Sequence, residues 1–348
     1  IETISTERRE LRAILSGMIE GVVAVDADGT IVLMNNGACA MLGVIPGESA
    51  GKPLWEGVPL RPVAEVIAHT LESARVEQSE VRVAETPHDR VLQLHAAPLN
   101  PPEGATGAVL VMHDITELRR LERVRRDFVA NASHELKTPV AAIHGLVETI
   151  LEDDAMPQQT QTAFLERIQR QTRRLSDLIA EMLKLSKLES ADGATPRKRL
   201  DLRDAVGAAL DTVNPLAHER SVRVRTALPP DPALVRGSGE SLERIVVNLL
   251  DNAVKFTPEG GLVRLRVEAS NGHVVLEVED QGPGIPVAER GRVFERFYRI
   301  DRGRSRDVGG TGLGLAIVKH LVHGLGGEVG VDEAADRGSL FRVRFPAA

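Results

Sequence analysis

The stretch Phe128-Val-Ala-Asn-Ala-Ser-His-Glu-Leu-Lys-Thr-Pro139 places a histidine within a helical pattern. Successive residues of an α-helix are about 100° apart, so His134 lies about 200° around the helix from Leu136. Leu136 belongs to an apolar stripe, and we therefore expect the histidine to face solvent. A neutral imidazole keeps one free nitrogen lone pair, which makes it a competent nucleophile toward a phosphoryl group. Taken by itself, the pattern favours an ordinary surface histidine on an exposed helix face, and only the other segments of the chain change that interpretation.

Apolar residues recur at steps of three, four and seven on both sides of this histidine. Such steps are typical of helices packed in a bundle or coiled coil. A break at 153–157 divides the pattern, so residues 115–190 predict two long amphipathic helices that form an antiparallel hairpin. One hairpin leaves apolar faces uncovered, and we therefore expect a homodimer with a four-helix bundle. We also expect Pro139 to kink its helix, because it removes the hydrogen bond to the Glu135 carbonyl.

The segments on either side of the hairpin mix strand and helix patterns. Residues 1–114 predict a small α+β domain, with a β-hairpin over 21–25 and 30–34 across an Asp-Gly turn. After a polar linker at 191–199, residues 200–348 predict an α/β sandwich. The other expected helices are 8–20, 202–218, 239–256 and 311–323, and the other expected strands are 79–84, 90–97, 107–113, 221–226, 262–269, 273–280, 327–332 and 339–345.

Two asparagines on one expected helix suggest a metal site. Asn248 and Asn252 are four residues apart, so both amides lie on the same face of the helix. Two amide oxygens can complete the octahedral shell of a magnesium ion that is already held by phosphate oxygens. Lys255 follows on the same helix and suits a phosphate contact. Ordinary helix-surface polarity explains the pair equally well when it is taken alone.

Two glycine-rich segments and a basic segment follow. Asp280-Gln-Gly-Pro-Gly284 comes directly after a strand, and its glycines permit a close backbone approach to a ligand. Gly309-Gly-Thr-Gly-Leu-Gly314 opens a helix, where backbone N–H groups favour phosphate. Between them, Phe294 and Phe297 precede an arginine-rich stretch over 299–306 that suits triphosphate oxygens. Each segment alone also fits a simple turn or a solvated loop.

Together the five segments resemble the H, N, G1, F and G2 boxes of sensor histidine kinases, in the order of that family. The resemblance covers residues 120–346. Residues 8–118 resemble a PAS sensor domain that ends in Asp114-Ile-Thr116, and the layout is similar to phosphate-sensing kinases of the PhoR type. The resemblance implies a multidomain α+β protein: a PAS domain, a dimeric hairpin and a Bergerat-type α/β sandwich that binds ATP.

The resemblance also implies roles for individual residues. His134 would accept the phosphoryl group of ATP and pass it to an aspartate on a response regulator. Glu135 would orient the histidine or act as its base, and Thr138 matches the position associated with phosphatase activity. Asn248 and Asn252 would ligate Mg²⁺. The implied ATP-binding residues are Asn248, Asn252, Lys255, Phe256, Asp280, Gly282, Gly284, Ile285, Phe294, Phe297, Arg299, Gly310, Thr311, Gly312, Leu313, Gly314 and Leu315.

Two rival functions fit part of the pattern. An ATPase of the gyrase, heat-shock or mismatch-repair type would share the last four segments, but it has no reason to carry His134 on an upstream hairpin. Such ATPases more often have an acidic residue at the position of Asn248. A degenerate sensor or dimer scaffold is the non-enzymatic rival, and the intact candidate residues argue against it. The balance between kinase and phosphatase activity stays open.

The composition of the chain limits its possible partners and its cellular location. The 348 residues carry a formal net charge of −7, which argues against a nucleic-acid partner. Cys39 is the single cysteine, and we expect it to be a small core residue in a reducing cytosol. The sequence contains no signal peptide and no apolar run long enough for a transmembrane helix. We expect a cytoplasmic location, with a membrane anchor only if upstream sequence is missing; the PAS domain would take a small-molecule ligand or a partner.

Overall fold

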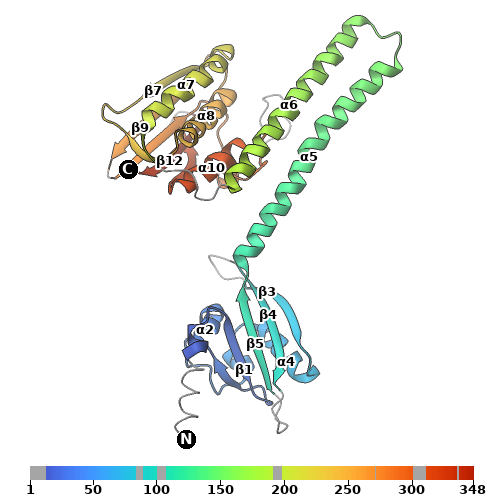
Figure 1. Ribbon diagram of the computed structural model, residues 1–348, viewed down its shortest axis with the longest axis vertical. Helices are drawn as coiled ribbons and strands as arrows, with labels where there is room; N and C mark the ends of the chain where they lie inside the picture. The colour runs from blue at the N-terminus through green and yellow to red at the C-terminus, as the bar shows by residue number, and fades with distance from the viewer. Residues whose placement is uncertain are drawn as a thin grey trace. The chain divides into compact units, whose positions relative to one another are not determined.

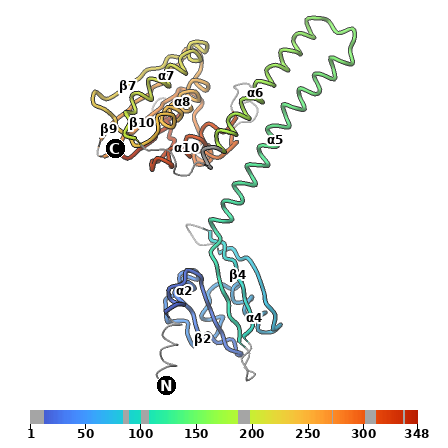
Figure 2. The backbone as a smooth tube through the Cα atoms, in the orientation of Figure 1, coloured from blue at the N-terminus to red at the C-terminus, as the bar shows by residue number. Residues whose placement is uncertain are grey.

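A computed structural model describes residues 13–83, 89–99, 107–190, 198–270, 272–300, 311–334 and 337–348. The chain forms two compact units, residues 1–127 and 128–348. Figures 1 and 2 trace the backbone through both units. Among the described residues, no helix combines the length and the apolar character that crossing a membrane requires.

The first unit is an antiparallel five-stranded sheet with helices inserted after its second strand. The strand order is β2-β1-β5-β4-β3, and every pairing is antiparallel. Leu92, Leu94 and Leu110 of the sheet are fully buried and share a core with Val63 and Ile67 of helix α4. The elements are β1 (Gly21–Val25), β2 (Ile31–Met34), α2 (Asn36–Leu42), α3 (Leu54–Gly57), α4 (Arg61–Ser73), β3 (Glu77–Val83), β4 (Arg90–Leu99) and β5 (Gly107–Asp114).

A tight junction joins β5 to the long helix α5 (Thr116–Glu152). Asp114 Oδ1 accepts hydrogen bonds from the Thr116 N–H (2.9 Å) and hydroxyl (2.5 Å), in the manner of a helix cap. Ile115 is buried, and its N–H donates to the Val91 carbonyl at 2.9 Å. The Thr116 hydroxyl also accepts the Val91 N–H at 2.9 Å. The first turn of α5 is therefore fixed to strand β4.

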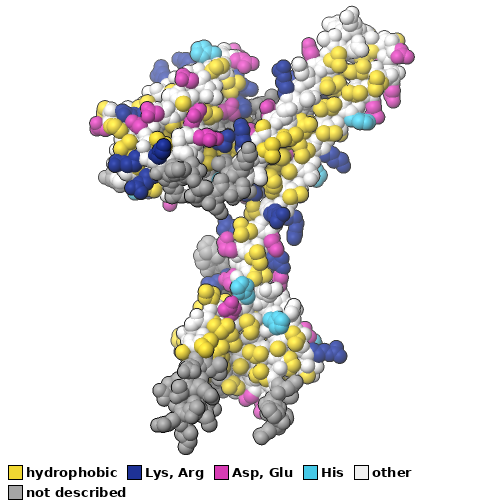
Figure 3. Space-filling model, viewed as in Figure 1, with side chains coloured by type: hydrophobic (Ala, Val, Ile, Leu, Met, Phe, Trp, Pro, Cys, Tyr) yellow, Lys and Arg dark blue, Asp and Glu magenta, His cyan; other side chains and the backbone are white. Residues whose placement is uncertain are grey.

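The hairpin consists of α5 and α6 (Gln158–Ser190), which run antiparallel beside each other (Figures 1 and 2). The expected break over 153–157 separates them. Helix α5 continues through Pro139, which is buried. Many apolar side chains of the hairpin are exposed, and Figure 3 shows a band of them along its visible face. The hairpin leaves part of its apolar stripes exposed, although Leu178 and Leu185 of α6 are buried.

The C-terminal part of the second unit is an α/β sandwich. Its sheet has the order β11-β12-β10-β9-β7, with β7 parallel to β9 and the other pairs antiparallel. Strands β6 and β8 form a separate ribbon. The elements are β6 (Lys198–Asp201), α7 (Leu202–Glu219), β7 (Arg223–Ala227), β8 (Leu234–Gly237), α8 (Gly239–Phe256), β9 (Leu262–Ser270), β10 (His273–Glu279), the short 3₁₀ helix η1 (Val287–Glu289), α10 (Gly314–Gly324), β11 (Glu328–Glu333) and β12 (Ser339–Pro346).

The expected fold class is confirmed, with local corrections. The helix expected from residue 311 begins at Gly314, because Gly312 has a φ of +74° that a right-handed helix does not accept. The strand expected from residue 221 begins at Arg223, because Ser221 has a φ of +55°. Strand β6 begins at Lys198, inside the expected linker. Of the expected helix over 8–20, residues 13–17 are helical within the described part of the chain. Helices α2, α3 and α4 and strand β8 were not predicted.

Candidate functional site

The two asparagines of α8 lie against the start of α10. Asn248 Nδ2 donates to the Arg244 carbonyl at 2.8 Å, which fixes the amide. A Cβ atom built on Gly314 would lie 2.8 Å from Asn248 Oδ1 and 3.9 Å from Asn252 Nδ2. The absence of a side chain at Gly314 therefore keeps both amides accessible from α10. The amide oxygen of Asn248 is the acceptor presented there, as a hard cation requires.

Lys255 is held one turn further along α8. Its Nζ lies 2.6 Å from Asp251 Oδ2, and both side chains are partly exposed. The Lys255 carbonyl accepts a hydrogen bond from Arg220 at 3.1 Å, which ties the end of α8 to the segment after α7. To contact a phosphate, the ammonium group would exchange the carboxylate for phosphate oxygens, both of which are anionic acceptors.

Asp280 follows β10 and is buried, with 3% of its surface exposed. Its Oδ1 accepts the N–H groups of Gly282 at 2.7 Å and Ser339 at 3.2 Å. Burial raises the pKa of the carboxyl, and these hydrogen bonds act in the opposite direction. A Cβ on Gly282 would lie 2.8 Å from Asp280 Oδ1 and 3.0 Å from the carbonyl oxygen of Phe256, whose side chain is exposed. The turn therefore needs glycine at position 282.

The turn that begins at Asp280 also packs against Gly338, the residue just before β12. Gly338 has a φ of +108°, and a Cβ there would lie 2.0 Å from the Asp280 carbonyl oxygen. Gly284 has a φ of +77° and also approaches the backbone of Gly338. Ile285 packs against the core of the sandwich. The role of Gly338 was missed from the sequence, although a glycine just before a strand was the available signal.

Phe294 and Phe297 anchor the residues that precede the arginine-rich stretch. Phe294 is buried and meets Phe341 edge-on, with ring centroids 6.3 Å apart. Phe297 is buried with a φ of +62°, a strained value for a bulky residue. Its N–H donates to the Gly312 carbonyl at 2.8 Å, and a Cβ on Gly312 would lie 2.8 Å from the Phe297 backbone. Residues 297 and 312 are thus fixed to each other.

Thr311, in the glycine-rich segment before α10, connects the sandwich to the hairpin. The Thr311 hydroxyl donates to Glu181 of α6, and it accepts the Leu313 N–H at 3.3 Å. Burial raises the pKa of the Glu181 carboxyl, while the Thr311 hydrogen bond and the charge of Lys255 lower it. Leu313 is buried and Leu315 packs against the core. Arg299 is half-buried, and Gly310 lies outside the described residues.

The helix α5 presents His134 to solvent, as predicted. The Thr138 hydroxyl donates to the His134 carbonyl at 3.1 Å. Glu135 lies 3.9 Å from Arg174 of α6, so its carboxylate faces the other helix of the hairpin. Six residues before the histidine, Phe128 packs against Phe297, with ring centroids 5.6 Å apart and the rings tilted by 39°.

The contacts of Phe128, Arg174 and Glu181 were not predicted from the sequence. Each joins segments that are far apart in the chain, and Thr311 and Glu181 are separated by 130 residues. No local spacing signals such contacts. They connect α5 with α6, and both helices with the sandwich, within the second unit.

Three family models match the chain in sequence order. Residues 15–120 match the PAS fold, residues 124–191 the His Kinase A (phospho-acceptor) domain, and residues 237–348 the histidine kinase-, DNA gyrase B- and HSP90-like ATPase. The sensor-like histidine kinase SenX3 of Mycobacterium tuberculosis is 33% identical over 98% of this chain and 81% of its own length. The chain belongs to the sensor histidine kinases.

Other members of this family match over nearly the whole chain. The phosphate regulon sensor protein PhoR of Pseudomonas aeruginosa is 32% identical over 94% of the chain and 72% of its own length. The sensor histidine kinase WalK of Bacillus subtilis is 31% identical over 98% of the chain, which spans 56% of WalK. The histidine kinase ThkA, solved in complex with the response regulator protein TrrA, shares the fold with a TM-score of 0.53. It is 18% identical and covers 94% of this chain and 96% of its own. The predicted family resemblance is confirmed.

Proposed function

We propose that the chain phosphorylates His134 with ATP and transfers the phosphoryl group to an aspartate of a response regulator. The observation that carries the proposal is that one unit, residues 128–348, contains both an exposed histidine and the Asn248–Asn252–Gly314 arrangement. A simple ATPase needs only the second of these. The ThkA structure with a response regulator shows that a kinase of this fold forms such a complex, which supports the proposed partner.

ATP would bind between α8, the Asp280 turn and the start of α10. Asn248 and Asn252 would hold Mg²⁺ through amide oxygens, and this donor set suits a hard cation. Lys255 and Arg299 would contact phosphates, and Asp280 would accept a hydrogen bond from the adenine amino group. A magnesium ion held by these amides would neutralise part of the phosphate charge. The other residues that the family resemblance implies for ATP binding would line this space.

The transfer needs a neutral ring nitrogen on His134. That nitrogen forms a bond to the γ-phosphorus while the bond from phosphorus to the bridging oxygen breaks, and ADP leaves. The second ring nitrogen carries the remaining proton, which Glu135 would accept or orient after leaving Arg174. In the second reaction the phosphoryl group passes to a carboxylate oxygen of the partner, which restores His134. We also propose that Thr138 supports phosphatase activity by positioning water.

The active form would be a homodimer in the cytoplasm, because the hairpin exposes apolar stripes and the reaction uses ATP. We propose the domain limits 1–114 for the PAS domain, 115–190 for the signalling helix and hairpin, 191–199 for the linker and 200–348 for the ATP-binding domain. The PAS domain would receive the signal as a ligand or a partner contact.

Labelling with γ-³²P ATP and magnesium tests the proposed nucleophile. We expect label on the chain that is labile in acid and stable in alkali, and none on His134→Gln. His144→Gln is the matched control, because His144 is an exposed histidine of the same helix that pairs with Glu148. Hydrolysis of ATP without label on any variant would favour the ATPase alternative, and equal label on His134→Gln would exclude this histidine as the acceptor.

A further inference from the structure

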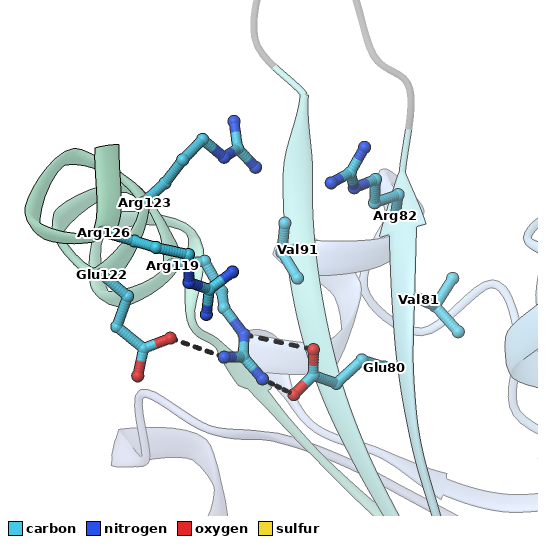
Figure 4. A pocket seen from close by; sticks show the side chains of 8 residues that line it. All are labelled: Glu80, Val81, Arg82, Val91, Arg119, Glu122, Arg123 and Arg126. Atoms are coloured by element: carbon cyan, nitrogen blue, oxygen red, sulfur yellow. Dashed lines mark hydrogen bonds and ion pairs between the residues drawn. The ribbon is translucent and has the colours of Figure 1, made fainter. Parts of the chain in front are cut away.

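A cavity of about 310 Å³ lies in the first unit, where the start of α5 passes the edge strand β3 and its neighbour β4 (Figure 4). Its walls carry four arginines and two glutamates, so positive charges exceed negative charges by two. The volume is at the lower end of the range for small-molecule sites. The lining residues are Glu80, Val81, Arg82, Val91, Arg119, Glu122, Arg123 and Arg126.

Both carboxylates of the cavity are already engaged by one arginine. Arg119 donates to Glu80 through two hydrogen bonds, one of them from Nε at 3.2 Å, and its Nη1 donates to Glu122 at 2.5 Å. These bonds join α5 to strand β3. In the described part of the chain, Arg82, Arg123 and Arg126 have neither an ion pair nor a hydrogen bond. Three guanidinium groups therefore face the cavity without a counter-charge there.

The backbone directs these three groups to the same place. Arg82 alternates with the buried Val81 and Val83, so it projects from the outer face of the sheet, opposite Val91 in the ladder. Arg123 and Arg126 follow Arg119 at four and seven residues, which is one face of a helix. Figure 4 shows the Arg123 and Arg82 side chains extending toward each other across Val91. Like charges at this spacing destabilise a helix unless an anion lies between them.

The arginine face is separate from the apolar face of α5. Leu118, Leu121 and Val124 are exposed, and their stripe lies roughly 180° around the helix from the arginines. A second copy that covers the apolar stripe would leave the cavity open.

We propose that this cavity binds a small, freely diffusing oxyanion with two negative charges, held by Arg82, Arg123 and Arg126. Guanidinium groups match such anions because they donate parallel hydrogen bonds to two oxygens. The anion balances the excess of two positive charges and connects β3 to α5. The proposal concerns the first unit alone and stands whether or not His134 is phosphorylated.

Isothermal titration calorimetry on the full chain tests this site, with sulfate and hydrogen phosphate as probes at fixed ionic strength without magnesium. We expect saturable binding of one anion per chain, and no binding of chloride. Arg82→Gln, Arg123→Gln and Arg126→Gln should each weaken binding about tenfold. Arg120→Gln is the matched control, since Arg120 is on the same helix, outside the cavity, and pairs only at the surface with Glu117. It should leave binding unchanged.

Thermal melting of each variant checks that it folds, and all three arginines are exposed enough to replace safely. The proposal is overturned if neither anion binds saturably, or if the three variants bind as tightly as Arg120→Gln. Binding to phosphatidylglycerol vesicles without binding of the free anions would also overturn it, because a membrane surface would then be the ligand.

Discussion

The hairpin and the ATP-binding sandwich use similar helices in opposite ways. On α8, Leu242, Ile245 and Leu249 are 0% exposed, because the sheet and the neighbouring helices cover them. On α5, Val140 is 51% exposed and Leu151 is 74% exposed. Both helices carry an amphipathic pattern, yet only the sandwich completes its own core. The difference shows that an apolar stripe indicates that one helix face packs against another surface. It does not indicate whether that surface belongs to the same chain or to a second copy.

The largest effect is expected inside the sandwich. Leu249→Ala should lower the free energy of unfolding of this domain by about 2–5 kcal/mol, because it leaves a cavity in a closed core. Urea unfolding measures the change. Leu228→Ala, at a position that is 42% exposed, should change it by about 0.5 kcal/mol or less. Equal costs at the two positions would contradict the description of a closed core.

In the hairpin, a substitution in the apolar stripe should weaken the association of two copies. Val147→Glu places a charge on the predicted seam between copies and should weaken the dimer about a hundredfold. Sedimentation equilibrium measures the dissociation constant. Val32→Glu makes the same change at an exposed position of β2 and should leave association unchanged. A Val147→Glu dimer as tight as the parent would mean that the exposed stripe has another use.

A smaller effect is expected at the contact of α10 with α8. Gly314→Ala should weaken ATP binding about tenfold, because the new Cβ would crowd Asn248 Oδ1. A fluorescent nucleotide analogue reports the affinity. Gly324→Ala, at the other end of α10, meets no atom within 4 Å and should bind normally. Unchanged affinity in Gly314→Ala would exclude this contact from the nucleotide site.

The smallest expected effect is on the pH dependence of the free energy of unfolding. Burial raises the pKa of Asp280, so the folded state binds a proton more readily than the unfolded state. The contribution of this group to stability should therefore fall as pH rises from the ordinary pKa through the raised one, and then level off. Urea unfolding over this range should show a shallower fall in Asp280→Asn, whose amide oxygen still accepts the Gly282 N–H. An identical slope in both proteins would mean that Asp280 does not titrate differently on folding.

The sequence predicts elements best where local signals agree. Helix α8 begins and ends at the predicted residues, because Ser238 caps it and its apolar residues form one buried stripe. Helix α4 was missed because Leu60, at its start, provides no side-chain cap, although Pro62 in the first turn was an available signal. Strands β6 and β8 have four residues each, too few for alternation to be recognised.

The candidate site was predictable as a set of segments and not as a geometry. Spacing put Asn248 and Asn252 on one helix face, but only the folded chain brings Gly314 against them. The positive φ of Phe297 depends on its bond to Gly312, and the Thr311–Glu181 contact depends on the packing of α6. Such features arise from tertiary contacts that no local pattern encodes.

The junction between β4 and α5 also offers a spectroscopic handle. The Val91 amide proton is bound by the Thr116 hydroxyl rather than by a neighbouring strand, so its protection depends on the first turn of α5. Its exchange with deuterium would follow the opening of this one junction, apart from the ladder protons of the sheet. A single amide would thus report how often the junction between the first domain and α5 opens.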